Sequence, residues 1–89
     1  MKEASWTGPF KKDLKRLIKR GYKLQKLHQV LSTLQQNENL PPSARAHLLQ
    51  GEWAGYWECH IEPDWLLIYK IIGNTLLLAR TGTHADLFE

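Results

Sequence analysis

The stretch WLLIYKIIGNTLLLARTG, residues 65–82, decides the fold. Residues 65–72 form a nearly continuous apolar run, which is typical of a central strand covered on both faces. Gly73-Asn74 is a tight hairpin signal. Residues 75–81 then read as the returning strand, and Gly82 interrupts it. The stretch therefore predicts a β-hairpin in the middle of a sheet.

Two further segments are predicted strands. Residues 56–61 alternate with the period of a half-buried strand. Residues 2–7 have β-branched and aromatic character around Trp6 and Thr7 and are a candidate edge strand. The alternation divides residues 56–61 into two faces: Tyr56, Glu58 and His60 on one, and Trp57, Cys59 and Ile61 on the other.

The segment between these strands predicts two amphipathic helices. Thr7-Gly8-Pro9 is a helix-start signal, because proline is tolerated in the first turn, where its missing N–H would be unpaired anyway. Gly21 is placed to end the first helix, and the second closes near residues 37–39, before Leu40-Pro41-Pro42. The apolar stripes are Phe10, Leu14, Leu17 and Ile18 in the first helix, and Leu24, Leu27, Val30, Leu31 and Leu34 in the second.

The predicted order of elements is thus β-α-α-β-β-β. This is an α+β fold in which a helical hairpin packs on a small, mainly antiparallel sheet. The sequence has no internal repeat, linker or low-complexity stretch, so we expect one domain over residues 1–89. No apolar run approaches the ~20 residues of a membrane span, and the single cysteine, Cys59, fits a reducing cytoplasm. We therefore expect a cytoplasmic protein with no membrane contact.

The net charge of +3 hides a strong asymmetry along the chain. Residues 1–26 hold nine of the twelve Lys and Arg residues and only two acids, which gives +7, while the rest of the chain carries −4. Such a segment favours a nucleic acid, an anionic surface or an acidic partner, and a solvated helix face is the alternative interpretation. The candidate contacts to a polyanion are Lys11, Lys12, Lys15, Arg16, Lys19 and Arg20.

Histidines are concentrated in the acidic part of the chain. His47, His60 and His84 lie there, and histidine is the side chain best suited to proton transfer near neutral pH. The turn Glu62-Pro63-Asp64 would fold Asp64 back toward His60. Arg80, His84 and Phe88 are spaced by four, so any helical turn there would project them on one side. If the three last strands are adjacent, the ends that carry His60, Asp64, Arg80 and His84 converge.

Such a set of residues has a natural use in RNA cleavage. The ribose 2′-hydroxyl must lose a proton and attack the phosphorus, and the departing 5′-oxygen must gain one, so two acid–base groups and one cation are sufficient without a metal. Arginine suits the phosphate, and the aromatic faces of Trp65 and Phe88 could hold unstacked bases. Taken singly, each histidine is also compatible with an ordinary surface position, and each aromatic with the core.

A metal site is the rival use of the same residues. His47, His60, His84 and Asp64 could supply imidazole and carboxylate ligands. No two of them lie at a familiar ligand spacing on a helix, and Pro63 breaks the one four-residue interval. We therefore expect no metal.

Two blocks of sequence carry a family resemblance. The first is HLLQGEWAGY at residues 47–56 with ECHIEPDWLLIY at residues 58–69, and the second is RTGTHADLF at residues 80–88. They resemble the YafQ family of bacterial toxins, within the RelE/ParE superfamily of type II toxin–antitoxin systems. The match covers most of residues 45–89, and over residues 1–44 it rests on the helix pattern and the length.

The resemblance implies a RelE-like fold and a metal-free endoribonuclease that needs no cofactor. Such a toxin cleaves messenger RNA in the ribosomal A site and inhibits translation. Phe88 would position a base, and Trp65 lines the same region. By position, His47, His60, Asp64, Arg80, His84 and Phe88 match residues of the family's active site.

The resemblance also implies roles for the other matched residues. His84 and His60 would share proton transfer, with Asp64 acting as a base or orienting one of them. Arg80 would stabilise the phosphate, and His47 would assist from the loop before the sheet. Which group takes which proton stays open at this point.

Partners follow from the resemblance as well. A small DinJ-like antitoxin would neutralise the toxin, with a ribbon-helix-helix part that dimerises on operator DNA and a C-terminal part that wraps the toxin. Two toxins and two antitoxins would form a heterotetramer that reaches DNA only through the antitoxin. The other implied partners are the 70S ribosome and mRNA.

Two departures from the family pattern leave alternatives open. Ala46 stands where relatives commonly have Asp, and Trp57 stands where they often have Arg. They are compatible with an inactive toxin that acts as a co-repressor with its antitoxin. The shared fold gives a separate alternative, a non-enzymatic inhibitor of a protein target such as DNA gyrase, as in the ParE branch, although a pure binder would not need the set of histidines and acids.

Overall fold

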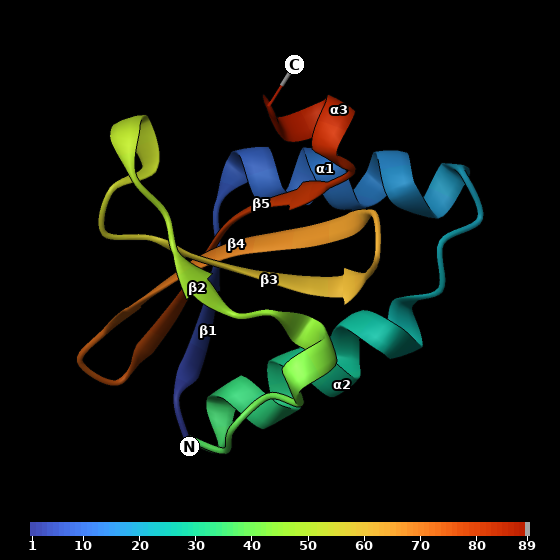
Figure 1. Ribbon diagram of the computed structural model, residues 1–89. Helices are drawn as coiled ribbons and strands as arrows, with labels where there is room; N and C mark the ends of the chain where they lie inside the picture. Colours follow the sequence, from blue (N-terminus) through green and yellow to red (C-terminus); the bar gives the residue numbers. More distant parts are fainter. Residues whose placement is uncertain (89) are drawn as a thin grey trace.

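A five-stranded sheet in the order β1-β5-β4-β3-β2 forms the centre of the molecule (Figure 1). The computed structural model describes residues 1–88. β1 runs parallel to β5, and all other neighbours are antiparallel, so the expected edge strand and central hairpin are confirmed. The strands are β1 (Glu3–Trp6), β2 (His47–Leu48), β3 (Trp57–Glu62), β4 (Trp65–Ile72) and β5 (Thr75–Gly82). β2 was not predicted, because two residues are too few to show a period.

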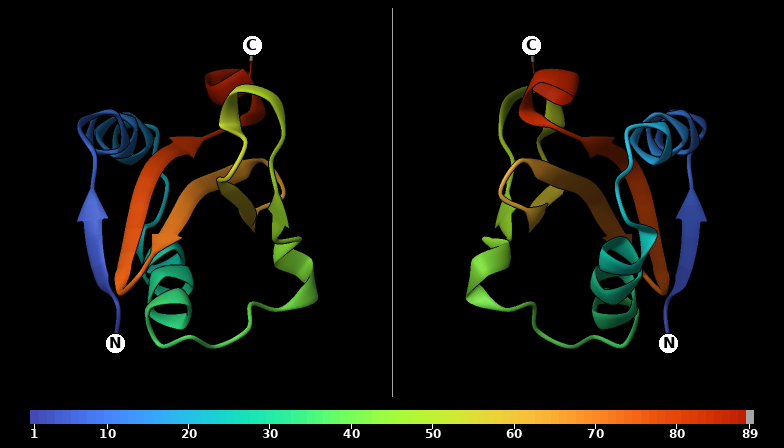
Figure 2. Two further views of the ribbon diagram at one scale, coloured as in Figure 1. Left: turned by 90° about the vertical axis from the view of Figure 1, so that its left-hand side faces the viewer. Right: turned by 90° about the vertical axis from the view of Figure 1, so that its right-hand side faces the viewer.

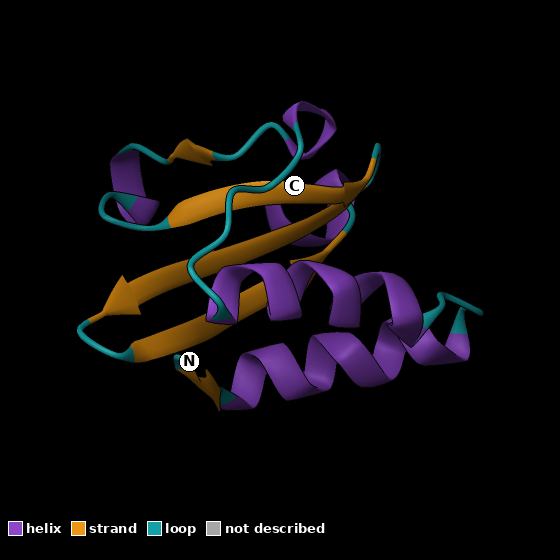
Figure 3. Ribbon diagram, turned by 90° about the horizontal axis from the view of Figure 1, so that it is seen from below, coloured by secondary structure: helices purple, strands orange, loops and turns teal. Residues whose placement is uncertain are grey.

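Two helices pack against this sheet. α1 (Gly8–Lys19) and α2 (Leu24–Gln35) have roughly parallel axes when the molecule is seen from below (Figure 3), but Figures 1 and 2 show them well apart, with α1 against β5 and α2 against β3. The two helices of the predicted hairpin therefore cover different parts of the sheet. Thr7 caps α1, because its Oγ1 accepts a hydrogen bond from the backbone N–H of Phe10 at 3.2 Å. Gly21 follows α1 with a φ of +91°, a conformation that favours glycine, so the predicted end of this helix is confirmed.

The core lies between the helices and one face of the sheet. The helices contribute Phe10, Leu14, Leu17, Leu27, Leu31 and Leu34, and the sheet contributes Cys59, Trp65, Leu67, Tyr69, Leu76 and Leu78. Burial raises the pKa of the Cys59 thiol to about 12, which makes it a core residue rather than a nucleophile.

The ends of both predicted apolar stripes differ from expectation. Ile18 is 47% exposed and Leu24 is 38% exposed, although both were assigned to the buried faces. They flank the turn at residues 20–23, which joins the two helices. Periodicity identifies the buried face of each helix correctly, but it does not show which residues at the ends of that face stay exposed.

A β-bulge changes the direction of the side chains in β5. Leu78 pairs with Tyr69, and Arg80 pairs with Ile68, so Ala79 is an extra residue between two register positions. Without it, Arg80 would share the core face with Leu78, because side chains alternate with a period of two. The bulge turns Arg80 to the opposite face, which is a common use of bulges near functional sites.

That opposite face carries polar residues in register across the strands. His47 pairs with Glu58, Glu58 with Ile68, and Ile68 with Arg80, so these side chains share one side of the sheet. His60 lies two residues further along β3 on the same side, as predicted. α1 and the short α3 (His84–Phe88) both lie at the end of the sheet where β5 finishes (Figure 2). In residues 1–88, no helix is long and apolar enough to cross a membrane.

Candidate active site

Asp64 and His84 form a hydrogen-bonded pair between distant parts of the chain. Asp64 lies in the turn between β3 and β4, and His84 is the first residue of α3. Oδ1 of Asp64 lies 2.9 Å from the backbone N–H of His84, which donates to it, and 2.5 Å from the His84 Nδ1. The backbone N–H, followed by the imidazole, holds the pKa of Asp64 below its usual range. Because the ionised carboxylate only accepts, the His84 Nδ1 carries a proton and the Nε2 is left for proton exchange.

His60 lies next to this pair. Its ring centroid is 5.8 Å from that of His84, and the planes are tilted by 56°. The Nδ1 of His60 is 3.2 Å from the carbonyl oxygen of Pro63, which can only accept a hydrogen bond. This nitrogen is therefore also the protonated one, and the Nε2 of His60 is available for proton transfer.

Glu58 is a buried carboxylate between two histidines. Its Oε1 lies 3.5 Å from Nε2 of His47 and 3.8 Å from Nε2 of His60, and its side chain is only 7% exposed. The Nδ1 of His47 is 2.7 Å from the carbonyl oxygen of Arg45, which can only accept a hydrogen bond. His47 therefore also carries its proton on Nδ1, as His60 and His84 do. A protonated His47 or His60 would have Glu58 as its counterion. The alternation of β3 places Glu58 on the face of His60, but nothing in the sequence predicts this role for it.

Arg80 is bound on one side by a buried carboxylate of α1. Its Nε donates to Oδ2 of Asp13 at 2.5 Å and its Nη2 donates to Oδ1 at 3.0 Å, while the Asp13 side chain is 3% exposed. These hydrogen bonds raise the pKa of Arg80, which stays a cation. The Nη1 group takes no part in this pair and is left for a ligand.

The idea that Arg80 shares a helical face with His84 and Phe88 is wrong. Arg80 belongs to β5, and only His84 and Phe88 belong to α3. The bulge at Ala79, rather than helical spacing, brings Arg80 to the face that carries the histidines.

The two predicted base-stacking aromatics have different positions. Phe88, in the last turn of α3, is 46% exposed and accessible to a ligand. Trp65 is 1% exposed, donates its Nε1–H to Thr81 Oγ1 at 2.9 Å, and meets the Tyr22 ring edge to face at 5.2 Å. Trp65 is therefore part of the core, and the expectation that it offers a face to a base is wrong. The apolar run of β4 did not show which of its aromatics is covered.

The predicted basic face of α1 divides into two groups. Lys11, Lys12, Lys15 and Lys19 are exposed on α1. Arg20 is instead committed to Asp86 of α3, with Nη1 and Nη2 donating at 2.8 and 3.1 Å, and Arg16 lies 3.7 Å from the same carboxylate. The lysines are available to a polyanion, whereas the two arginines anchor α3.

Asp86 joins α3 to α1 and to the end of β5. The Arg20 guanidinium holds the pKa of Asp86 well below its usual range, and the backbone N–H of Thr83 donates to the same carboxylate at 3.0 Å. Gly82 lies within β5, not beyond it, and a Cβ at this position would come within 3.0 Å of Asp86. Glycine therefore permits α3 to fold back against the strand. Asp86 was not predicted as part of the site.

The histidines and carboxylates of this region are arranged as separate pairs. Within residues 1–88, no three His, Cys, Asp or Glu side chains gather in a way that could hold a metal ion. His47, His60 and His84 instead make separate contacts with Glu58, Pro63 and Asp64.

Comparison with known proteins gives a consistent result. The mRNA interferase toxin YafQ of Escherichia coli strain K12 is 45% identical over 89 residues, which cover 98% of this chain and 96% of that protein. A chain of the E. coli DinJ–YafQ complex superposes with a TM-score of 0.91 at 41% identity, covering 100% of both chains. A copper-bound mutant toxin from Helicobacter pylori superposes with a TM-score of 0.94 at 36% identity, covering 99% of this chain and 100% of that chain.

The family comparison agrees with the fold. The family model for the bacterial toxin of the type II toxin–antitoxin system, YafQ, matches residues 2–89. Nearly the whole chain is therefore accounted for by one family, including all three α-helices and all five strands of the described residues. This chain belongs to the YafQ family of bacterial toxins of type II toxin–antitoxin systems.

Proposed function

We propose that this chain, as a single toxin domain over residues 1–89, is an mRNA interferase that cleaves messages in the ribosomal A site and so inhibits translation. Its E. coli relative is named an mRNA interferase toxin. One observation carries the proposal: the rings of His60 and His84 lie 5.8 Å apart, each with its Nδ1 bound to an acceptor and its Nε2 left for proton transfer. Two such groups, with Arg80 on the same face of the sheet as His60, fit acid–base cleavage of RNA.

The reaction needs two proton transfers at one phosphate. One imidazole takes the proton of the 2′-hydroxyl while the O2′–P bond forms. The P–O5′ bond breaks, and the second imidazole gives a proton to the departing 5′-oxygen. The products are a 2′,3′-cyclic phosphate and a 5′-hydroxyl end. His84 and His60 share these transfers, Asp64 orients His84, and His47 assists with Glu58 as its counterion.

Arg80 and Phe88 hold the RNA in this proposal. Nη1 of Arg80 donates to the non-bridging oxygens of the phosphate, where negative charge grows in the transition state. Asp13 fixes the other edge of the guanidinium, so little rotamer freedom is lost when RNA binds. Phe88 is exposed on α3 and stacks on an unpaired base.

Catalysis by these residues needs no metal ion. The H. pylori toxin described as copper-bound makes the point testable. A chelator of transition metals that spares Mg²⁺, such as 1,10-phenanthroline, should leave the cleavage rate unchanged, since ribosomes keep their magnesium. A rate that falls with the chelator and returns with added copper or zinc would contradict metal-free catalysis.

The implied partners follow from the same family membership. The E. coli YafQ chain forms a complex with DinJ. A DinJ-like antitoxin binds this chain in a heterotetramer of two toxins and two antitoxins, and operator DNA is contacted only by the antitoxin. The exposed lysines of α1 bind ribosomal RNA, with an affinity that falls as the salt concentration rises. Lys11, Lys12, Lys15 and Lys19 give α1 a dense positive charge, which supports this assignment.

The two departures from the family pattern are compatible with activity. Trp57 packs against the core, on the face opposite to Glu58 and His60, so its identity does not change the charge of the histidine face. Ala46 precedes His47, whose ring is oriented by the Arg45 carbonyl and Glu58 rather than by residue 46.

The test uses purified 70S ribosomes programmed with a defined message. Wild-type protein should produce new 5′-hydroxyl ends in the A-site codon, and His84→Ala should lower the rate by roughly 10²–10⁴-fold. Arg80→Ala should do the same by roughly 10²-fold or more. Circular dichroism checks that both variants fold. No cleavage by the wild type, or equal cleavage by the variants, would overturn the proposal, and growth arrest without cleavage would favour a protein target.

A further inference from the structure

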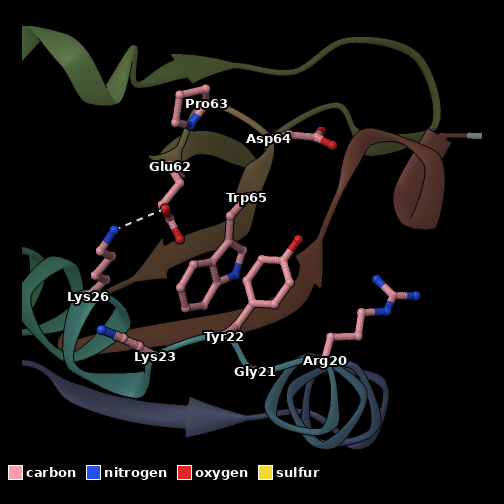
Figure 4. A pocket seen from close by; sticks show the side chains of 9 residues that line it. All are labelled: Arg20, Gly21, Tyr22, Lys23, Lys26, Glu62, Pro63, Asp64 and Trp65. Carbon is pink, nitrogen blue, oxygen red and sulfur yellow. Dashed lines mark hydrogen bonds and ion pairs between the residues drawn. The ribbon is translucent and has the colours of Figure 1, made fainter.

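A cavity opens beside the Asp64–His84 pair, between the α1–α2 turn and the β3–β4 turn (Figure 4). Its volume is about 450 Å³, which lies in the range of sites that hold a small ligand or one nucleotide. Asp64 forms part of its wall, and Arg20 and Lys26 line the opposite side. None of the proton-transfer steps uses this space.

The aromatic ring that the cavity presents is Tyr22. Trp65 lies beneath it with only 1% of its surface exposed, and the two rings meet edge to face at 5.2 Å with planes 88° apart. Tyr22 itself is half-buried, so the contact with Trp65 fixes one edge of its ring and leaves the rest toward the cavity (Figure 4). Tyr22 thus occupies the place where the sequence suggested a stacking role for Trp65.

Of the three basic side chains that line the cavity, two are paired with carboxylates. Lys26 donates to Glu62 at 2.9 Å, and Arg20 is bound to Asp86 at 2.8 Å. Lys23 is exposed, and among residues 1–88 no carboxylate lies within ion-pair distance of it. Lys23 is therefore the cation in this wall that is ready to meet an anionic group.

We propose that Tyr22 and Lys23 form a subsite for one unpaired nucleotide of the message, next to the nucleotide that is cut. The base stacks on Tyr22, and its phosphate meets Lys23. An aromatic face with a nearby cation is the usual pair of contacts for single-stranded RNA. The shared wall at Asp64 places this nucleotide beside the reacting phosphate, so the subsite contributes to which codon is cleaved. The inference rests on the proposed function.

The experiment compares binding and turnover on programmed ribosomes. The variants are Tyr22→Leu, which keeps an apolar cover on Trp65 but removes the aromatic face, and Lys23→Ala. Each should raise KM roughly tenfold with kcat within about twofold, since Tyr22→Leu removes the stacking of the base and Lys23→Ala removes a contact to the phosphate. Tyr22→Leu should also flatten the preference among messages that differ by one base beside the cleaved position.

Two matched variants serve as controls. Tyr22→Phe keeps the ring and should match the wild type in KM. Lys2→Ala removes the same charge next to β1, away from the cavity, and should change neither KM nor kcat. Thermal melts establish that all four proteins fold, and binding to ribosomes that carry a 2′-O-methylated, uncleavable message gives a second readout.

The outcomes separate this inference from the proposed function. A wild type that does not cleave refutes the proposed function, while the uncleavable message still reports whether Tyr22→Leu weakens binding. Wild-type KM, base preference and binding in both variants would overturn the subsite. So would weaker binding of the antitoxin together with unchanged KM, because the cavity would then belong to the antitoxin.

Discussion

Two carboxylates in different surroundings orient side chains of the candidate active site. Asp64 holds His84 and has a 63% exposed side chain, whereas Asp13 holds Arg80 and has a 3% exposed side chain. Asp64 lies in a turn, with solvent on most sides. Asp13 lies on α1 against β5, where it also accepts the backbone N–H of Thr81 at 3.2 Å.

The difference in burial between Asp64 and Asp13 predicts which of them contributes to the stability of the fold as well as to the orientation of its partner. An exposed ion pair contributes little to the free energy of unfolding because water screens it. A buried carboxylate must keep its partners, because the unpaired group that remains after a substitution is costly. We therefore expect substitutions at Asp64 to change activity alone, and substitutions at Asp13 to change activity and stability together.

The largest effect is expected for Asp13→Ala. It removes three hydrogen bonds, two from Arg80 and one from the Thr81 amide, and should lower the free energy of unfolding by about 3 kcal/mol. Cleavage should also fall, because the guanidinium loses its fixed orientation. Urea unfolding measures the first effect and ribosome cleavage the second.

A double-mutant cycle provides the control for Asp13. Asp13→Ala, Arg80→Ala and the double variant should show a coupling energy of about 1 kcal/mol or more, as expected for residues in direct contact. If the two substitutions change the free energy of unfolding additively, the interaction between Asp13 and Arg80 is contradicted. Additive effects would mean that Asp13 supports α1 without holding Arg80.

A substitution at Asp64 should separate activity from stability most clearly. Asp64→Asn keeps the shape but no longer requires a proton on Nδ1 of His84, so cleavage should fall by roughly 10²-fold or more. The melting temperature should stay close to that of the wild type, because both side chains are exposed. A large loss of stability with normal cleavage would mean that Asp64 supports the fold and does not orient His84 for catalysis.

The side chain of Asp86 is 12% exposed, which lies between the exposed fractions of Asp13 and Asp64. Asp86→Asn loosens the contact of α3 with Arg20 and should lower cleavage roughly tenfold by displacing His84. Hydrogen exchange at the amides of α3 should become faster. Normal exchange together with a lower rate would mean that Asp86 acts on RNA rather than on α3.

The smallest effect concerns pH. Asp86 has a pKa below its usual range because Arg20 favours its charged form, so the unfolded chain binds the proton first as the pH falls. The stabilisation is complete above about pH 5 and is lost progressively below about pH 4, the pKa of an unfolded aspartate. Asp86→Asn should therefore flatten the dependence of the melting temperature on pH between 6 and 2.5. An unchanged slope would assign the acid sensitivity to other carboxylates.

The sequence predicted the elements of this fold better than the contacts between them. The apolar run of β4, the Gly73-Asn74 turn and the helix-start signal at Thr7 each depend on neighbouring residues, and each is confirmed. The sequence also singled out His60, Asp64 and His84, and the structure brings them close together.

The undetected features depend on contacts over long distances in the chain. Asp13 and Arg80 are 67 residues apart, and nothing near either residue reveals the other. The burial of Trp65 depends on Tyr22, which arrives from a different element. The bulge carries no signal either, because alanine at position 79 is as compatible with a regular strand as with an irregular one.

The bulge has a consequence for how such a toxin can be silenced in a genome. Loss of the three bases that encode Ala79 would leave every histidine, acid and arginine of the candidate site in the gene, yet it would restore the regular pairing of β5 and return Arg80 to the core face. An inventory of catalytic residues would still score such a gene as intact. In surveys of natural variants, the spacing between Leu78 and Arg80 is therefore as informative about toxicity as the residues themselves.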